Sequence, residues 1–191
     1  MQSTTQPSFL RDMSLTIVAL VTLSPMLAGT ALAAGSHAGG HGHDSERPAI
    51  GAPGEASAVD RTVEITMTDN AYAPEAIEVH AGETIRFVVR NEGAAVHEFN
   101  IATPAMHEGH RGEMMTMFQE GIIGGGEIDR EKMHAMGMSH DHANSVLLEP
   151  GEEETVVWRF PDATNLEFAC NVPGHYESGM VGRFRFQHHG G

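Results

Sequence analysis

The sequence predicts an all-β fold, a sandwich or barrel of short strands, and three observations predict it. Apolar and polar residues alternate with a period of two in several segments of the chain. Those segments are rich in β-branched and aromatic residues, and Gly or Pro turn signals separate them. This pattern favours a sandwich or barrel over a sheet in which strands alternate with helices.

The expected strands number roughly eight and begin at residue 61. They cover residues 62–68, two short strands within 76–91 on either side of Ala81-Gly82, and residues 96–101, 145–151, 154–160, 166–170 and 181–186. The apolar side chains expected to fill the interior are Ile85, Phe87, Val89, Val157, Phe160, Phe168, Phe184 and Phe186. We interpret Trp158 as a packing residue.

Residues 1–33 are typical of a secretory signal peptide. Arg11 precedes an apolar run over 15–27, which is too short for a spanning helix, and Ala31 and Ala33 suit the positions before a cleavage site. The sequence therefore predicts export to a periplasm, with no membrane association after cleavage. Residues 34–60, rich in Gly, Ala, Ser and Pro, are expected to form a flexible leader that carries His37, His41 and His43. Residues 61–191 then form one domain.

The chain carries a formal net charge of −15 over 191 residues. Phosphate backbones and anionic lipid surfaces bind through Lys and Arg, so this charge argues against both as partners. We expect no nucleic acid partner.

Residues 102–145 interrupt the strand pattern and form a long insert. Connections longer than about 15 residues are uncommon in compact domains and are often functional. This insert holds Met106, Met114, Met115, Met117, Met133, Met136 and Met138, with His107, His110, His134, His140 and His142. Two short helices are expected near 113–120 and 127–135, separated by the glycines at 124–126.

The segment "CNVPGHYESGM" at 170–180 suggests a metal site. It holds the chain's single cysteine, Cys170, with His175 five residues and Met180 ten residues later. Thiolate and imidazole together suit copper and zinc, and a weak axial thioether favours copper. A fourth ligand has to come from a separate strand, and His97 is the best-placed candidate. Two imidazoles, one thiolate and a distant Met make a blue-copper electron-transfer site.

Other interpretations of Cys170 were weighed. An exported protein usually pairs its cysteines, so a lone one is also compatible with an inert buried thiol or an intermolecular bridge. Structural zinc sites normally use more thiolates or a second pair of histidines, and Met is a poor zinc ligand. A cysteine protease with His175 as base leaves Met180 and the strand pattern unexplained.

The same segment, with the His-bearing strand upstream, resembles the cupredoxin family of blue copper proteins. "YAPEAIEVHAGETIRFVVRN" at 72–91 also resembles the early cupredoxin strands. The resemblance covers about 62–101 and 146–187, and implies a Greek-key β-sandwich that holds a type 1 copper through His97, Cys170, His175 and Met180. Multicopper oxidases and copper nitrite reductases place a His beside the cysteine, whereas Cys170 has Ala169 and Asn171. We therefore expect no enzyme activity.

The insert and the leader predict additional copper binding. Thioethers select Cu(I), and imidazole accepts either oxidation state. This combination resembles the periplasmic copper-tolerance cupredoxins of the CopI type. The candidate extra ligands are the seven Met and five His of the insert and the three His of the leader. The alternative is that the Met residues are soft packing over the barrel.

Two functions follow from these patterns. The first is copper tolerance or homeostasis, with copper ions as cargo and a redox protein or a copper exporter as a candidate partner. The alternative is a soluble periplasmic electron carrier that shuttles single electrons between redox partners. A cuprous oxidase is disfavoured because one mononuclear site with a filled coordination shell leaves little room for substrate.

Overall fold

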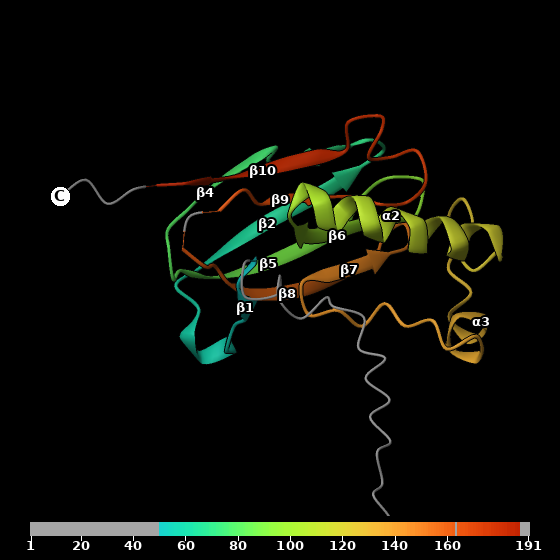
Figure 1. The fold of residues 1–191 in the computed structure, drawn as a ribbon, viewed down its shortest axis with the longest axis horizontal. Coiled ribbons are helices and arrows are strands. Elements are labelled where there is room, and N and C mark those ends of the chain that lie inside the picture. The colour runs from blue at the N-terminus through green and yellow to red at the C-terminus, as the bar shows by residue number, and fades with distance from the viewer. Residues whose placement is uncertain (1–49, 163, 188–191) are drawn as a thin grey trace, which may run out of the picture. The chain divides into compact units, whose positions relative to one another are not determined.

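The computed structural model describes residues 50–162 and 164–187, and within them the strands form two five-stranded sheets (Figure 1). The first sheet has the order β1-β8-β5-β2-β3, and the second has the order β4-β10-β9-β6-β7. Strands β2 and β5 pair in parallel, as do β4 and β10, and the other neighbours are antiparallel. The prediction of an all-β sandwich with a partly helical insert is confirmed.

All eight expected strands are present. They are β2 (Arg61–Thr68), β4 (Ala76–Val79), β5 (Thr84–Asn91), β6 (His97–Ala102), β7 (Ser145–Leu148), β8 (Glu153–Arg159), β9 (Glu167–Ala169) and β10 (Val181–Phe186). Two further strands, β1 (Ala52–Pro53) and β3 (Ala71–Ala73), were not expected. Both are too short to show a period of two, so only their pairing partners reveal them.

The leader expected over 34–60 ends earlier in the structure. From Ile50 onward the chain packs on the sandwich: Ile50 is buried, and its carbonyl oxygen accepts a hydrogen bond from Nε1 of Trp158 at 2.8 Å. Strand β1 pairs with β8, and a short 3₁₀ helix, η1 (Ala56–Ala58), leads into β2. The expected signal peptide lies outside the described residues.

The interior between the sheets is aromatic and aliphatic. Ile85, Phe87 and Val89 of β5 are fully buried, as the alternation predicted. Along β8 the prediction of Val157 was wrong, because Val156 and Trp158 face inward while Val157 is half-buried. Successive strand residues point to opposite faces, so Val157 cannot share a face with Val156 and Trp158. Of the other expected residues, Phe160, Phe168 and Phe184 are buried, and Phe186 packs against the core while partly exposed.

The insert folds into a longer helix than expected. Helix α2 (Pro104–Gln119) starts nine residues before the expected position, and helix α3 (Arg130–Ala135) is short. Two glycines, Gly109 and Gly112, lower the helix propensity of the first half of α2. For this reason the sequence did not predict that half of the helix. Its start is nevertheless well capped. The Thr103 hydroxyl accepts from the Met106 amide at 3.3 Å, and Pro104 occupies the first turn.

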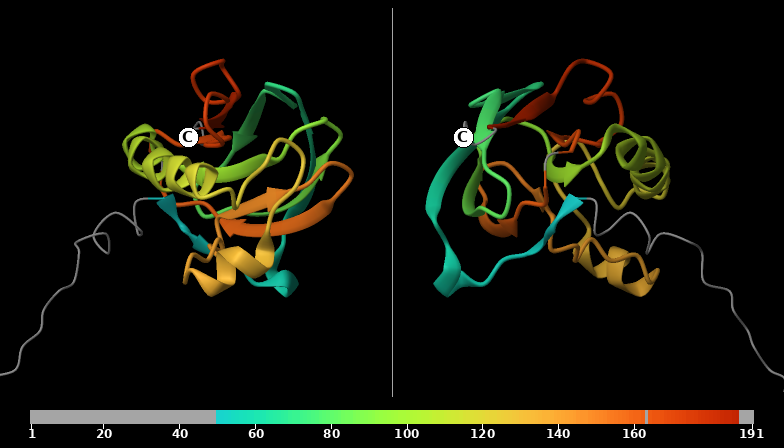
Figure 2. Two further views of the ribbon diagram at one scale, coloured as in Figure 1. Left: turned by 90° about the vertical axis from the view of Figure 1, so that its right-hand side faces the viewer. Right: turned by 60° about the vertical axis from the view of Figure 1, so that its left-hand side comes forward.

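Helix α2 lies against β6, and this placement changes the character of that strand (Figures 1 and 2). All six residues of β6 are buried, which a strand with one solvated face would not allow. The insert is therefore a cover over the outer face of the second sheet beside β6. It brings His107 of α2 into contact with Asn171, the residue after Cys170.

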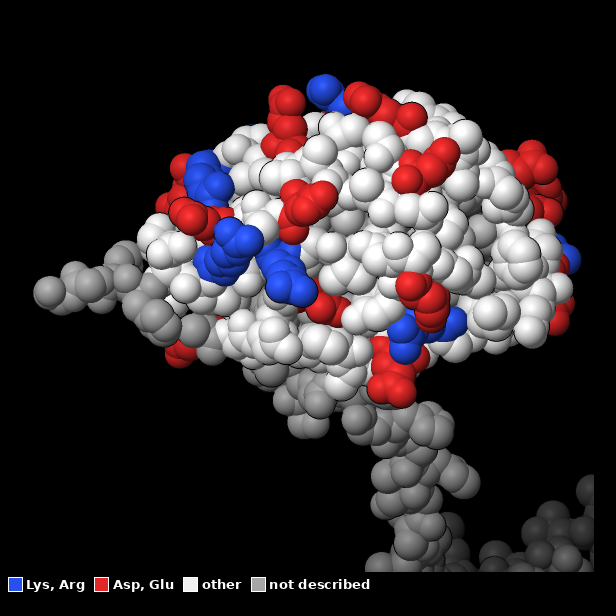
Figure 3. Space-filling view, turned by 90° about the horizontal axis from the view of Figure 1, so that it is seen from above, with Lys and Arg blue, Asp and Glu red and all other residues white. Residues whose placement is uncertain are grey.

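The surface carries mixed charge dominated by acidic groups. Figure 3 shows Asp and Glu side chains spread over one face, with Lys or Arg beside several of them. Arg61 pairs with Glu83 at 2.6 Å and Arg130 with Glu152 at 2.9 Å, and such exposed pairs add little stability. Among the described residues, no helix has the length and apolar character needed to cross a bilayer.

Candidate metal centre

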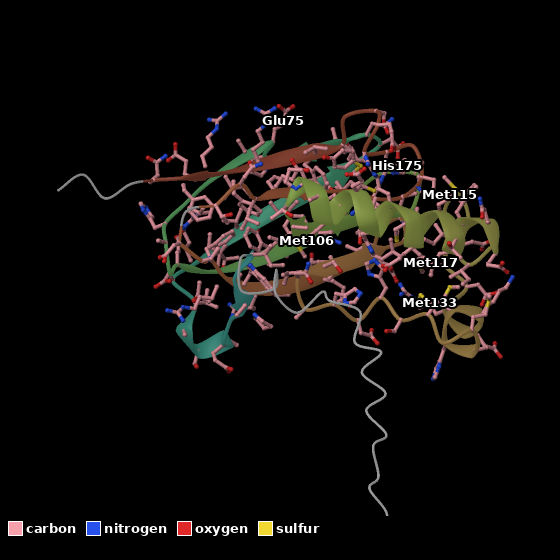
Figure 4. All side chains as sticks on the ribbon, in the orientation of Figure 1. Glu75, Met106, Met115, Met117, Met133 and His175 are labelled. Atoms are coloured by element: carbon pink, nitrogen blue, oxygen red, sulfur yellow. The ribbon has the colours of Figure 1, made fainter. Side chains whose placement is uncertain are left out.

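Three of the four predicted ligands converge at one end of the sandwich. The ligand atoms of His97, Cys170 and His175 all lie within 4.8 Å of one another. Nδ1 of His97 is 3.2 Å from Nδ1 of His175. Sγ of Cys170 lies 3.3 Å from Nδ1 of His175 and 4.0 Å from Nδ1 of His97. Figure 4 places His175 at the end of the molecule where the insert also lies.

These spacings fit a trigonal metal site. First-row divalent ions bind imidazole nitrogen at about 2.0 Å and thiolate sulfur at about 2.3 Å. Angles of about 120° at the metal then separate the two nitrogens by about 3.5 Å and each nitrogen from sulfur by about 3.7 Å. The observed distances of 3.2, 3.3 and 4.0 Å lie on both sides of these values. Two imidazoles and one thiolate are the donors of a blue-copper site, so the residues fit copper.

Backbone hydrogen bonds hold the loop that carries Cys170 and His175. The Cys170 amide donates to the Met180 carbonyl at 3.2 Å, which closes the two ends of the loop. The amides of His175 and Met180 donate to the carbonyls of Val172 and His175, each at 3.0 Å. Gly174 has φ of +88°, a conformation that suits glycine, and it reverses the chain just before His175. The loop geometry is thus set by the polypeptide itself.

Met180, the predicted axial ligand, is fully buried at the end of this loop. Its backbone is bonded to both Cys170 and His175, which brings the residue beside the two donors that the loop carries. Its role as a ligand stays a prediction.

Asp69 orients His97, and sequence reasoning missed it. Oδ1 of Asp69 lies 3.1 Å from Nε2 of His97, so Nδ1 of the same ring is left to face the metal position. The same oxygen accepts from the amide of Ala94 at 3.0 Å. These hydrogen bonds, that of His97 first, lower the pKa of Asp69. Carboxylates that hold a ligating His in this way fix its tautomer and raise its basicity.

Gly93 makes room for this contact. A Cβ atom at position 93 would lie 2.6 Å from Oδ1 of Asp69 and 2.7 Å from Nε2 of His97, closer than such atoms ever approach. A signal for Asp69 did exist in the sequence, since "TDN" follows the first long strand as a turn. Only the fold shows that this turn reaches His97.

The electrostatics of the metal-free centre keep the thiol protonated. Burial raises the pKa of Cys170 to about 12, against a smaller opposing effect of the Glu98 amide, which donates to Sγ at 3.3 Å. Burial, and then the neighbouring His97, lower the pKa of His175, so that its ring is neutral. A metal that binds here has to displace one proton from sulfur and none from His175.

Known proteins are similar in sequence to this chain over most of its length. The copper-resistant cuproprotein CopI of Pseudomonas aeruginosa is 45% identical over 150 residues, which are 73% of this chain and 83% of that protein. The chain belongs to the CopI family. CopI of Rubrivivax gelatinosus is 36% identical over 172 residues, or 86% of this chain and 93% of the relative. A family model described as a Cupredoxin-like domain matches residues 31–111. The predicted resemblance to CopI-type cupredoxins is confirmed.

Solved structures agree with this family in fold. Reduced auracyanin from the photosynthetic bacterium Roseiflexus castenholzii matches with a TM-score of 0.50 and 22% identity, covering 68% of this chain and 99% of that one. Auracyanin B matches with a TM-score of 0.53 and 17% identity, covering 73% and 97%. At these identities the likeness shows the fold alone.

The methionines of this CopI-family chain differ in burial. Met114 and Met117, three residues apart on α2, both belong to the core. Met106, Met133 and Met138 are partly buried and pack against it. Met115 and Met136 are 42% and 41% exposed. Figure 4 shows Met115, Met117 and Met133 at the same end of the molecule as His175. Packing accounts for five of the seven, and their binding of copper stays a prediction.

The histidines of the insert divide into those that meet Glu98 and those that do not. Nε2 of His110 and Nε2 of His140 lie 2.8 and 2.7 Å from Oε1 of Glu98. The ring of His142 lies 6.0 Å from that of His140 between centroids. His107 is buried, with Nδ1 3.2 Å from Oδ1 of Asn171. His134 is exposed on α3, and His37, His41 and His43 lie outside the described residues.

Glu98 is the second residue that sequence reasoning missed. Burial alone would raise the pKa of this fully buried carboxyl, but His140 and His110 hold it well below its usual range. Burial likewise acts to lower the pKa of His110, while its hydrogen bond to Glu98 prevails and raises the value to about 9. A signal was present, because Glu98 is the one Asp or Glu in "VHEFNI", a strand with three large apolar residues.

Proposed function

We propose that this protein is an exported cupredoxin that binds copper at a type 1 site and acts in copper tolerance. His97, Cys170 and His175 are the in-plane ligands, and Met180 is the axial ligand. The convergence of Sγ of Cys170 with Nδ1 of His97 and Nδ1 of His175 carries the proposal. The printed names of the curated relatives, copper-resistant cuproproteins, support the link to tolerance.

Export to the periplasm is part of this proposal. The apolar run at 15–27 and the small residues at 31–35 support it as a secretory signal, and an exported protein meets copper before it reaches the cytoplasm. We further propose that the protein is not an enzyme. Cys170 and His97 are fully buried, and a centre filled by four ligands has no open position for a substrate.

Reconstitution with copper tests the site. The metal-free protein is titrated with Cu(II), and bound metal is counted while the visible spectrum is recorded. The expected result is an intense copper–thiolate absorption band that saturates at one copper. Cys170→Ala should lack the band, and His134→Ala, which changes an exposed imidazole on α3, should keep it. A copper-loaded protein without the band would contradict the proposed ligand set.

Growth tests the role in tolerance. Cells that lack the gene are grown in rising copper concentrations with a plasmid carrying either the natural sequence or Cys170→Ala. The natural sequence should restore growth, and the variant should restore it less or not at all. Equal growth of deleted and restored cells would refute the tolerance role without touching the copper site.

Electron transfer is the second candidate function, and the half-buried ring of His175 favours it. This ring is the least buried of the three donors that converge, so it offers a short route between the site and a docked partner. Stopped-flow reduction by a periplasmic cytochrome tests this function. Two results together would favour an electron carrier over a tolerance protein. Electron exchange with the cytochrome would be rapid, and cells would need the protein for growth at ordinary copper concentrations.

A further inference from the structure

A second cluster of donor atoms lies on the other face of β6. Adjacent residues of a strand point to opposite faces, so His97 turns toward the loop of Cys170 and Glu98 turns toward α2. Among the described residues, Glu98, His110 and His140 form a group whose donor atoms lie within 4.8 Å of one another. The side chains of Glu98, His110 and His140 are 0%, 13% and 6% exposed. Three separate segments therefore bring their donors together in the interior.

Each oxygen of Glu98 has its own set of neighbours. Oε2 accepts from the backbone amide and the side-chain amide of Asn171, at 3.1 and 2.7 Å. Oε1 accepts from Asn100 at 3.2 Å and faces Nε2 of His110 and of His140. The carboxylate is thus held by one oxygen and presents the other to two imidazoles. A carboxylate fixed in this way is oriented in advance for a metal.

The ring of His140 lies at ion-pair distance from Glu98, but its orientation leaves its nitrogens unsatisfied. Nε2 of His140 lies 2.7 Å from Oε1, yet both of its ring nitrogens are buried without a hydrogen-bond partner. Buried polar groups nearly always have a hydrogen-bond or metal partner. The unsatisfied nitrogens of His140 therefore indicate a bound group at this position. Two ligands of one metal, each at about 2.05 Å and separated by an angle of about 90°, place their atoms about 2.9 Å apart. The spacing resembles that of two ligands sharing a metal.

A cavity reaches one member of this cluster, His140. It has a volume of 490 Å³ and is lined by His140 and His142, with Asp141, Glu154 and Met133 around them. Acidic residues outnumber Arg130 in the lining, and a cavity lined by negative charge concentrates cations. The ring of His142 lies 6.4 Å from that of His110 and 6.0 Å from that of His140 between centroids, so it can add a third imidazole. The cluster therefore borders a cavity at His140 and has a further imidazole nearby.

We propose that Glu98, His110 and His140 form a second copper site, free of sulfur, with His142 at its entrance. Imidazole nitrogen and carboxylate oxygen bind borderline divalent ions, and among these Cu(II) binds most tightly. The choice of copper over zinc rests on the proposed function. The existence of the site rests on the donor geometry alone.

The two sites are linked through Glu98. Its amide donates to Sγ of Cys170 at 3.3 Å, and its peptide bond joins it to His97. Its Oε2 holds the amide of Asn171, the residue after Cys170. A metal bound at Oε1 therefore acts on two ligands of the type 1 site through short paths. Filling the second site should alter the properties of the first.

The test uses the full exported chain with Cys170, His37, His41 and His43 replaced by Ala. This background removes the thiolate of the type 1 site and the imidazoles of the leader, so copper that is lost on a further change within the insert belongs to neither of them. Cu(II) is titrated against a competing chelator, and the bound copper is examined by electron paramagnetic resonance. One copper should remain, with nitrogen couplings from imidazole. Adding His110→Ala and His140→Ala together should weaken its binding at least about a hundredfold.

His134→Ala in the same background is the matched control, because it removes an exposed imidazole from the same insert. It should leave the copper in place. If the double variant fails to fold, Glu98→Gln keeps the shape and most hydrogen bonds of this side chain and should still lose at least about tenfold in affinity. Undiminished binding in the folded variants would overturn the proposal. A lower melting temperature with unchanged copper binding would show that the cluster is only a structural ion pair.

The link is tested with Cys170 intact and the type 1 site filled. Zn(II), which is spectroscopically silent, should shift the copper–thiolate band or its paramagnetic resonance parameters. The shift should be absent when His110 and His140 are both Ala. Zinc binding that leaves the type 1 spectrum unchanged would overturn the link.

Discussion

Two donor clusters on opposite faces of β6 differ in how the chain builds them. The first uses sulfur and imidazole, and two of its three convergent donors lie on one loop that its own backbone hydrogen bonds close. The second uses a carboxylate and imidazoles from β6, α2 and the segment after α3. A loop of local contacts fixes the first, and docking of the insert fixes the second. Neighbouring residues of one strand, His97 and Glu98, thereby serve sites of different chemistry.

The largest expected effect separates the two clusters. Cys170→Ala removes the thiolate of the metal centre, so the copper–thiolate band should vanish and copper affinity there should fall at least about a hundredfold. Copper bound at the second cluster should persist, because none of its donors is changed. Metal counting together with visible absorption measures both. Loss of all bound copper from the folded variant would contradict a second cluster that binds copper without Cys170.

The methionines of α2 give the next largest effect. Met114→Ala should destabilise the metal-free protein by about 2–5 kcal/mol, because a fully buried side chain leaves a cavity. Met115→Ala, its exposed neighbour, should change stability by no more than about 0.5 kcal/mol. Urea unfolding measures both. A Met114 variant that keeps its stability but loses a bound copper would instead identify this thioether as a ligand.

The pH should affect the thiolate centre in a defined direction. The Cys170 thiol has a pKa of about 12 in the metal-free protein, so copper displaces a proton throughout the range below that value. Apparent copper affinity should therefore rise about tenfold per pH unit between about pH 7 and pH 9. His175 adds no slope there, because burial lowers its pKa. Chelator competition at several pH values measures the slope, and a flat profile would contradict a protonated thiol.

The smallest expected effect concerns the orientation of His97. Asp69→Asn keeps a hydrogen-bond acceptor but removes the charge beside Nε2, so copper affinity should fall by about tenfold or less with the band retained. Glu75→Gln removes another exposed carboxylate, on the segment before β4, and serves as the control. The comparison is made by chelator competition on both variants. Equal affinities would show that Asp69 does not tune the site.

The regular alternation of apolar and polar residues made most strands predictable. Prediction failed where a segment has no such alternation. Eight strands of the sandwich were expected, whereas β1 and β3 are too short to carry a pattern and exist because of their partners. Val157 was placed on the wrong face because a run of two valines fits either phase of the alternation. Helix α2 began earlier than expected because its cap at Thr103 and the packing of its buried face together offset the cost of two internal glycines.

The sequence by itself determined the candidates for the thiolate centre. The spacing from Cys170 to His175 and Met180 lies within one loop, and local chain geometry can be inferred from turn residues. Only the tertiary structure decided that Asp69 supports His97, that Met114 and Met117 serve packing, and that Glu98 meets His110 and His140. These contacts join segments far apart in the chain. They depend on how the insert packs across β6, which no local pattern encodes.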